Sequence, residues 1–206
     1  MFVSLVPPGY AEGGGLLAAP VEGWAEMSGI RCDGPGSVLG VGDVVVPEHR
    51  LRIASGYDDS YHLTPERLLH NALRLGHRGS LVHYVGMSHY FRLERSGDGL
   101  FVSLAGGVLN VACAAWHRDL AERAGALGFD PIWSLSYELF DAHCWGDWKQ
   151  RASDGSPALT GWVPPSTLLS PAHSGAMGYL QAVARAFVGI ARAAGGRGRF
   201  QVGEPW

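Results

Sequence analysis

Cysteine is scarce in this sequence, and the three cysteines, Cys32, Cys113 and Cys144, are widely spaced. No CxxC pair and no cysteine–histidine spacing typical of a zinc site occurs, so the pattern indicates neither a disulfide framework nor a metal centre. Basic residues are also few: 16 Lys and Arg stand against 19 Asp and Glu, and they are scattered along the chain. We therefore expect no nucleic-acid partner.

Long hydrophobic runs are missing as well. No apolar stretch approaches the roughly 20 residues of a membrane-spanning helix, and the start, MFVSLVPPGYAEGGG, lacks the basic residues and long apolar run of a signal peptide. No predicted strand is followed by a GxGxxG or GxxxxGK[ST] loop, which excludes the usual phosphate-binding cofactor sites. These absences predict a protein with no membrane contact and no cofactor, cytoplasmic by default.

Glycine and tryptophan, in contrast, are abundant, with 30 and 7 residues. Hydrophobic residues make up 47% of the chain and charged residues 17%, a balance typical of a globular domain. The 206 residues suffice for a sizeable core. Because residues 1–42 are rich in Gly and Pro and show no sustained period, we expect an irregular leader there and a folded domain over 43–206.

Strands and helices alternate along this domain. Apolar runs with β-branched residues predict strands near 43–53, 80–87, 131–138 and 199–204. Apolar residues at helical spacing predict helices near 65–76, 108–126 and 175–195. Thr64 and Pro65 are a typical N-cap and first residue for the first helix. The turn RSGDG predicts a small hairpin inserted at about 90–104, and residues 141–173 indicate a long loop.

This alternation requires parallel strands joined by crossover helices. A doubly wound sheet and a barrel both meet that requirement, but the phosphate loop of the first is missing. Polar residues at the carboxyl ends of the strands are typical of the second. We predict an α/β fold of the (β/α)8 TIM-barrel type, of which about four βα units, the first half, are present. The open sheet edges of such a half-barrel favour self-association.

Polar and aromatic side chains follow the predicted strands. The carboxylates Glu138 and Glu204, at two strand ends, could face each other across the barrel mouth as the acid–base or nucleophile pair of glycoside hydrolysis. Flat aromatic rings suit the apolar faces of sugars. The residues expected to bind a carbohydrate substrate are His89, Tyr90, Trp133, Tyr137, His143, Trp145, Trp148 and Trp162.

Each of these residues also has a structural interpretation. Glu204 could be paired with an arginine, Glu138 could be a barrel-mouth residue, and the tryptophans could pack within the long loop. Asp141, His143 and Asp147 have no specific metal-site spacing, so no metal is predicted.

Gly203-Glu204-Pro205 resembles the Asn-Glu-Pro signature of the large clan of TIM-barrel glycoside hydrolases. In that clan the glutamate ends strand four and acts as the general acid/base, and the matching strand is also the fourth predicted here. The resemblance implies a glycoside hydrolase-like barrel with Glu204 in that role. Gly203 replaces the Asn that holds the sugar's 2-hydroxyl, and the clan's nucleophile, on strand seven, would lie beyond the C-terminus.

The segment SYELFDAHCWGDWKQR…TGWVPPSTLLSP…GEPW resembles barrel domains inside large tail proteins of bacteriophages and gene transfer agents. This second resemblance implies a noncatalytic carbohydrate-binding or structural module, associated with the virion. An enzyme and a tail module thus both remain open. Because only four barrel strands are predicted, we expect no sugar hydrolysis from this chain alone.

Overall fold

The computed structural model describes residues 51–86, 89–103 and 105–202, with short pieces at 8–11, 17–22, 24 and 26. The chain separates into two compact units, Met1–Leu39 and Gly40–Trp206. All described helices and strands belong to the second unit. Most of the first predicted strand, at 43–50, lies outside the described residues, and a strand is found at its end, over Ile53–Gly56.

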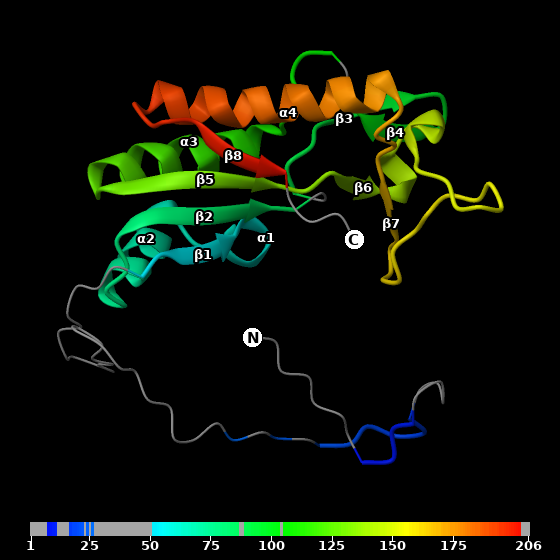
Figure 1. Ribbon diagram of the computed structural model, residues 1–206, viewed down its shortest axis with the longest axis horizontal. Helices are drawn as coiled ribbons and strands as arrows, with labels where there is room; N and C mark the ends of the chain where they lie inside the picture. Colours follow the sequence, from blue (N-terminus) through cyan, green and yellow to red (C-terminus); the bar gives the residue numbers. More distant parts are fainter. Residues whose placement is uncertain are drawn as a thin grey trace. The chain divides into compact units, whose positions relative to one another are not determined.

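Four parallel strands form the main sheet (Figure 1). They are β1 (Ile53–Gly56), β2 (Gly79–Val85), β5 (Phe129–Leu135) and β8 (Arg199–Val202). Their order in the sheet, β1-β2-β5-β8, is their order along the chain. In a doubly wound sheet the order in which strands are added reverses partway across the sheet, whereas in a barrel each new strand is added beside the one before it. The structure is therefore of the α/β type predicted, and the sheet is open within the described residues.

A helix follows each of the first three strands and ends within about three residues of the predicted limits. These helices are α2 (Pro65–Arg74), α3 (Val111–Ala126) and α4 (Ser174–Ala193). A single turn, α1 (Tyr57–Ser60), precedes α2. Thr64 caps α2 as predicted, because its side chain accepts a hydrogen bond from the backbone N–H of Arg67. Among the helices in the described ranges, none has the length and apolar character of a membrane span.

The other two helices begin at polar caps that the sequence analysis did not name. His173 caps α4: its Nδ1 accepts from the backbone N–H of Ala176 at 3.2 Å. An unprotonated imidazole nitrogen is a good acceptor, although histidine is seldom the preferred cap. Helix α3 begins after Asn110 rather than at 108, because the Asn110 Oδ1 accepts from the backbone N–H of Cys113 at 2.8 Å.

The strand predicted at 131–138 is two strands in different sheets. β5 ends at Leu135, and β6 (Glu138–Phe140) pairs antiparallel with β7 (Ser166–Leu168). At the break, the Ser136 hydroxyl accepts a hydrogen bond from the backbone N–H of Glu138 at 3.3 Å, which turns the chain out of the parallel sheet. The segment 141–173 therefore holds a strand, as well as the short turns η1 (Asp141–His143) and η2 (Gly146–Trp148).

A second small sheet stands beside this one at the carboxyl end of the parallel strands (Figure 1). It is the antiparallel hairpin of β3 (Leu93–Ser96) and β4 (Gly99–Val102). Its turn uses Gly97 at φ 58°, a conformation that favours glycine. Two small antiparallel sheets, β3–β4 and β6–β7, are thus inserted at the carboxyl end of the parallel sheet.

The core lies between the parallel sheet and the helices. In register across the four strands, Ser55, His83, Trp133 and Phe200 form one row. His83 and Trp133, in the central strands, are fully buried, whereas Phe200 is 48% exposed. Burial on the helix side therefore falls away at β8, the last strand of the sheet.

Candidate functional site

The two carboxylates predicted as a catalytic pair have different outcomes. Glu204 lies outside the described residues, so its separation from Glu138 is not defined. Glu138 is in β6, not at the end of β5, and its side chain is 1% exposed. Because the chain turns at Ser136, Glu138 lies away from the edge of the parallel sheet, in a buried position. A carboxylate with so little exposed surface is poorly placed to reach a polymeric substrate.

Three of the predicted carbohydrate-binding residues are core residues. Trp133 and Tyr90 are fully buried, and Trp148 is 5% exposed. Trp133 packs against His117 and Phe187, with ring centroids 5.6 and 5.7 Å away. Burial also raises the pKa of the Tyr90 hydroxyl above its usual range. Rings enclosed in this way contribute to packing and offer no open face to a ligand.

The predicted residues with more exposed surface are dispersed. His143 donates from Nδ1 to the carbonyl of Leu100 at 2.8 Å, and Trp145 donates to the carbonyl of Val102 at 3.1 Å. Both bonds tie the segment after β6 to strand β4. Trp162 is 43% exposed and donates weakly to the Ser166 hydroxyl at 3.4 Å. Tyr137 lies elsewhere, on a groove beside α4. A role for these residues in ligand binding stays a prediction.

His89 belongs to a contact that sequence reasoning missed. Asp58, in the turn after β1, pairs with His89, beyond β2: Oδ1 and Nδ1 are 3.3 Å apart. The same carboxylate accepts from the backbone N–H of Gly86 at 3.1 Å. Burial raises the pKa of Asp58, and the neighbouring His89 opposes this shift. The contact ties together the carboxyl ends of two neighbouring strands. Its sequence signal is an acidic residue two positions after β1.

No metal site is evident in the parts of the chain that the structure describes, where no three His, Cys, Asp or Glu side chains gather as ligands. The free thiols Cys113 and Cys144 are buried. Burial raises the pKa of each to about 12, so both are protonated at neutral pH and neither has the thiolate that a reactive cysteine requires.

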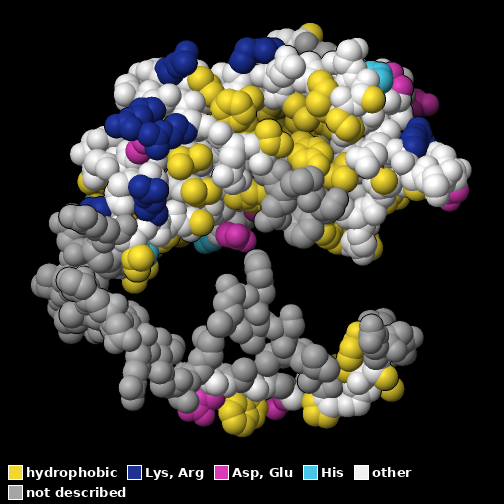
Figure 2. All heavy atoms as spheres, in the orientation of Figure 1, with side chains coloured by type: hydrophobic (Ala, Val, Ile, Leu, Met, Phe, Trp, Pro, Cys, Tyr) yellow, Lys and Arg dark blue, Asp and Glu magenta, His cyan; other side chains and the backbone are white. Residues whose placement is uncertain are grey.

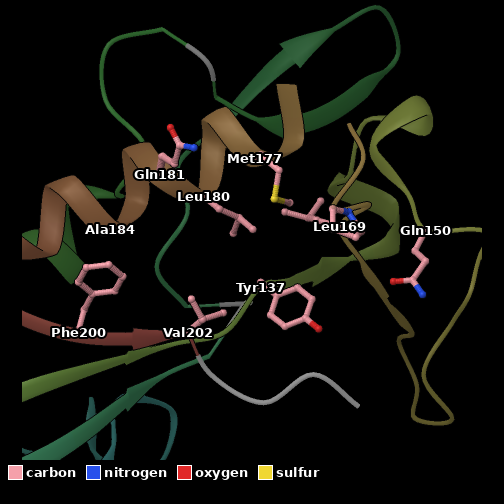
Figure 3. A pocket seen from close by; sticks show the side chains of 10 residues that line it. Tyr137, Gln150, Leu169, Met177, Leu180, Gln181, Ala184, Phe200 and Val202 are labelled. Carbon is pink, nitrogen blue, oxygen red and sulfur yellow. The ribbon is translucent and has the colours of Figure 1, made fainter. Parts of the chain in front are cut away.

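An apolar groove lies beside the last strand (Figure 3). Its cavity volume is about 620 Å³. We call it the β8 groove, and its lining residues are Tyr137, Gln150, Leu169, Pro171, Met177, Leu180, Gln181, Ala184, Phe200 and Val202. Helix α4 forms one wall and β8 lies along the other side, with Leu169 and Tyr137 at the end nearest β6 and β7.

The β8 groove is exposed because α4 has apolar residues on two faces. Val183 and Phe187 are buried in the core, as their helical spacing predicts, and so is Tyr179. Met177 and Leu180, which the same spacing places on the buried face, line the groove instead. Phe200 and Val202, in the last predicted strand, are 48% and 65% exposed. Figure 2 shows hydrophobic side chains gathered over α4 and β8. An exposed apolar patch of this kind typically marks an interaction surface.

Two family models match the chain. One, described as the non-contractile tail sheath N-terminal domain, matches residues 1–42. The other, described as the non-contractile tail sheath protein TIM barrel, matches residues 47–206. The chain belongs to the non-contractile tail sheath protein family.

This family membership corrects the predicted function. The glycoside hydrolase interpretation, with Glu204 as acid/base, is wrong, because the models match a structural tail protein instead. The Gly-Glu-Pro resemblance rested on three residues and misled. The resemblance to tail proteins, and the barrel class, are confirmed. A tail sheath protein is associated with the virion, as the second resemblance implied. The cytoplasmic default and a carbohydrate partner have no support from the family.

Proposed function

We propose that this chain is a noncatalytic structural subunit of a tail sheath. The observation that carries the proposal is the match of two tail sheath models, in order, to residues 1–42 and 47–206. The interior positions of Glu138, Tyr90 and Trp133 support it, because these residues serve packing in the folded domain. In this role the barrel-type fold is a scaffold that presents surfaces to neighbouring subunits.

The β8 groove is the surface that best suits such a role. A sheath subunit must hold its neighbours through stable contacts, and the centres of stable interfaces are apolar and rich in aromatic residues and methionine. Met177, Leu180 and Phe200 supply such side chains at one place on the surface. Among the described strands β8 pairs with β5 alone, so its other edge can add backbone hydrogen bonds to a contact with a neighbouring strand.

The proposal is tested by locating the chain in tailed particles of the virus that encodes it. Gold-labelled antibodies raised against residues 51–202 are expected to decorate the tail along its length in electron micrographs. Antibody adsorbed beforehand with the purified chain is the control. Labelling of the head alone, of the tail tip alone, or of no part of the particle would contradict a sheath role.

A further inference from the structure

Three polar rings lie next to one another in the core, in the layer between the parallel sheet and the helices. They are His83 in β2, Trp133 in β5 and His117 in α3, and each side chain is fully buried. The ring centroids are 5.3 Å apart for His83 and His117, 5.6 Å for His117 and Trp133, and 6.1 Å for His83 and Trp133. We call these three residues the three-ring cluster.

Each ring of the three-ring cluster has one nitrogen without a hydrogen-bond partner among the described residues. These nitrogens are His83 Nε2, His117 Nε2 and Trp133 Nε1, and all three are buried. A buried polar group that lacks a hydrogen bond is destabilising, and folded proteins rarely contain one. Because the three atoms belong to neighbouring rings, one shared partner is the simplest way to satisfy them.

The bonds that the rings already make determine what this partner must do. The His117 Nδ1 lies 2.7 Å from the Cys113 carbonyl, which can only accept, so Nδ1 carries the proton and Nε2 is an acceptor. The Trp133 Nε1 can only donate. The His83 Nδ1 lies 2.8 Å from the Ser55 hydroxyl, which can donate or accept, so His83 Nε2 can take either role. The partner must therefore both donate and accept.

The rings of the cluster meet at their edges, where their nitrogens lie. The interplanar angles are 63° between His83 and His117, 69° between His117 and Trp133, and 83° between His83 and Trp133, so no two of these rings are stacked face to face. Apolar rings pack around them: Phe187 lies 5.0 Å from His117, and Trp116 is stacked on His83 at 5.3 Å, measured between centroids. These surroundings favour a small neutral partner over a charged one.

We propose that the three-ring cluster binds one internal water molecule. The water accepts a hydrogen bond from Trp133 Nε1 and donates one to His117 Nε2. One hydrogen and one lone pair remain, so the water also pairs with His83 Nε2 in either tautomer of that ring. Buried waters typically make about three hydrogen bonds, the number that this cluster provides.

Ions match the three nitrogens less well than water does. A cation has no lone pair, so it leaves the N–H of Trp133 without an acceptor. An anion meets the lone pair of His117 Nε2, which repels it. Water therefore fits the set best, and it joins α3 to both central strands, β2 and β5, by hydrogen bonds. This inference goes beyond the proposed sheath role, because it concerns the interior of the domain and does not depend on how the chain assembles.

The test observes the indole proton of Trp133 in the full chain labelled with ¹⁵N. A water-selective rotating-frame Overhauser experiment is expected to show a cross-peak between this proton and water, with the sign of a dipolar contact rather than of proton exchange. Trp116 is the matched control in the same spectrum, since its Nε1 donates to the Leu63 carbonyl at 2.9 Å. Its indole proton is expected to show no such cross-peak. Triple-resonance spectra assign both signals.

A high-resolution crystal structure of the same chain is the second measurement. Solvent density is expected at about 2.7–3.2 Å from at least two of the three nitrogens. If that density is missing, or if the Trp133 indole proton has no dipolar contact with water, the inference is overturned. A Trp133 signal that shifts when EDTA is added would also overturn it, because the cluster would then hold a metal ion in place of water.

Discussion

His83 and His117 are two buried imidazoles whose rings lie 5.3 Å apart in the core. His83 shares a hydrogen bond with the Ser55 hydroxyl, and the His117 Nδ1 donates to the Cys113 carbonyl. The Nε2 atoms of both rings are buried, with no hydrogen-bond partner among the described atoms. Burial lowers the pKa of His117 to about 4, and burial together with the neighbouring His117 lowers that of His83 well below its ordinary value. Both rings are therefore neutral in the folded protein at neutral pH.

This pair predicts acid sensitivity. Above pH 6.5 the histidines are neutral in both the folded and the unfolded chain and add no pH dependence. Below pH 6.5 these histidines are protonated in the unfolded chain but stay neutral in the folded one. The free energy of unfolding therefore falls as pH drops from about 6.5 toward 4. The slope is up to about 1.4 kcal/mol per pH unit for each histidine. Urea unfolding of wild type and His117→Gln at several pH values measures it.

The variant is expected to show a shallower slope than wild type. His70→Gln, at an exposed position on α2, is the control and should leave the slope unchanged. Equal slopes for wild type and His117→Gln would show that His117 is protonated alike in the folded and unfolded states.

Gly86 predicts a second effect at the scale of one residue. A Cβ at this position would lie 1.7 Å from the Oδ2 of Asp58, so Gly86→Ala must displace the carboxylate that joins β1 to β2. We expect a loss of about 2 kcal/mol in unfolding free energy. Gly178→Ala is the matched comparison, because a Cβ there meets nothing within 4 Å and alanine favours the helix, so it should stabilise α4 by ~0.5 kcal/mol. Thermal melts that show the same sign for both would contradict this account.

At the scale of the element, Asn110 joins α3 to the turn before it. Its Oδ1 caps the helix through the N–H of Cys113, and its Nδ2 donates to the carbonyl of His89 at 2.7 Å. One side chain thus satisfies a helix N-terminus and a loop carbonyl. The start of α3 depends on this residue more than on the apolar spacing of the helix.

Replacing Asn110 by alanine is therefore expected to lower the unfolding free energy by ~1 kcal/mol or more, since both bonds are lost. Asn110→Asp keeps the cap acceptor and loses only the donor, so its loss should be smaller. Chemical denaturation of the two variants gives the comparison. An aspartate variant as unstable as the alanine variant would indicate that the cap contributes little.

At the scale of the whole molecule, the residues forming the buried core come from one continuous part of the chain. They run from Tyr57 in α1 to Ala191 in α4, all within the second compact unit. The N-terminal family match at 1–42 and the barrel match at 47–206 divide the chain at nearly the same place. The barrel part thus has a hydrophobic core of its own.

A shortened chain of residues 47–206 is accordingly expected to fold without the first 46 residues. Its helical circular dichroism signal and a single cooperative melting transition should be retained. The control is a chain ending at residue 173, which lacks α4 with Val183 and Phe187 and should lose the transition. If 47–206 melts without cooperativity, the N-terminal unit contributes to the core.

The sequence alone determined the alternation of strands and helices, because each amphipathic segment shows its period locally. Thr64 and Pro65 marked the start of α2, and RSGDG marked the turn of the hairpin β3–β4. The resemblance to phage tail proteins, which also came from the sequence alone, agrees with the tail sheath family. What these patterns share is that their signal lies within a few residues of one another.

Only the tertiary structure decided which side chains are accessible. The sequence places Glu138 at a strand end, but the hydrogen bond from its N–H to Ser136 turns the chain there. The sequence also suggests Trp133 as a ring that binds sugar, but residues of α3 and α4 enclose it. Phe200 and Val202 alternate like core residues, yet they are exposed because β8 has no further strand beside it among the described residues. Exposure depends on which distant segments pack on a residue, and no local period records that.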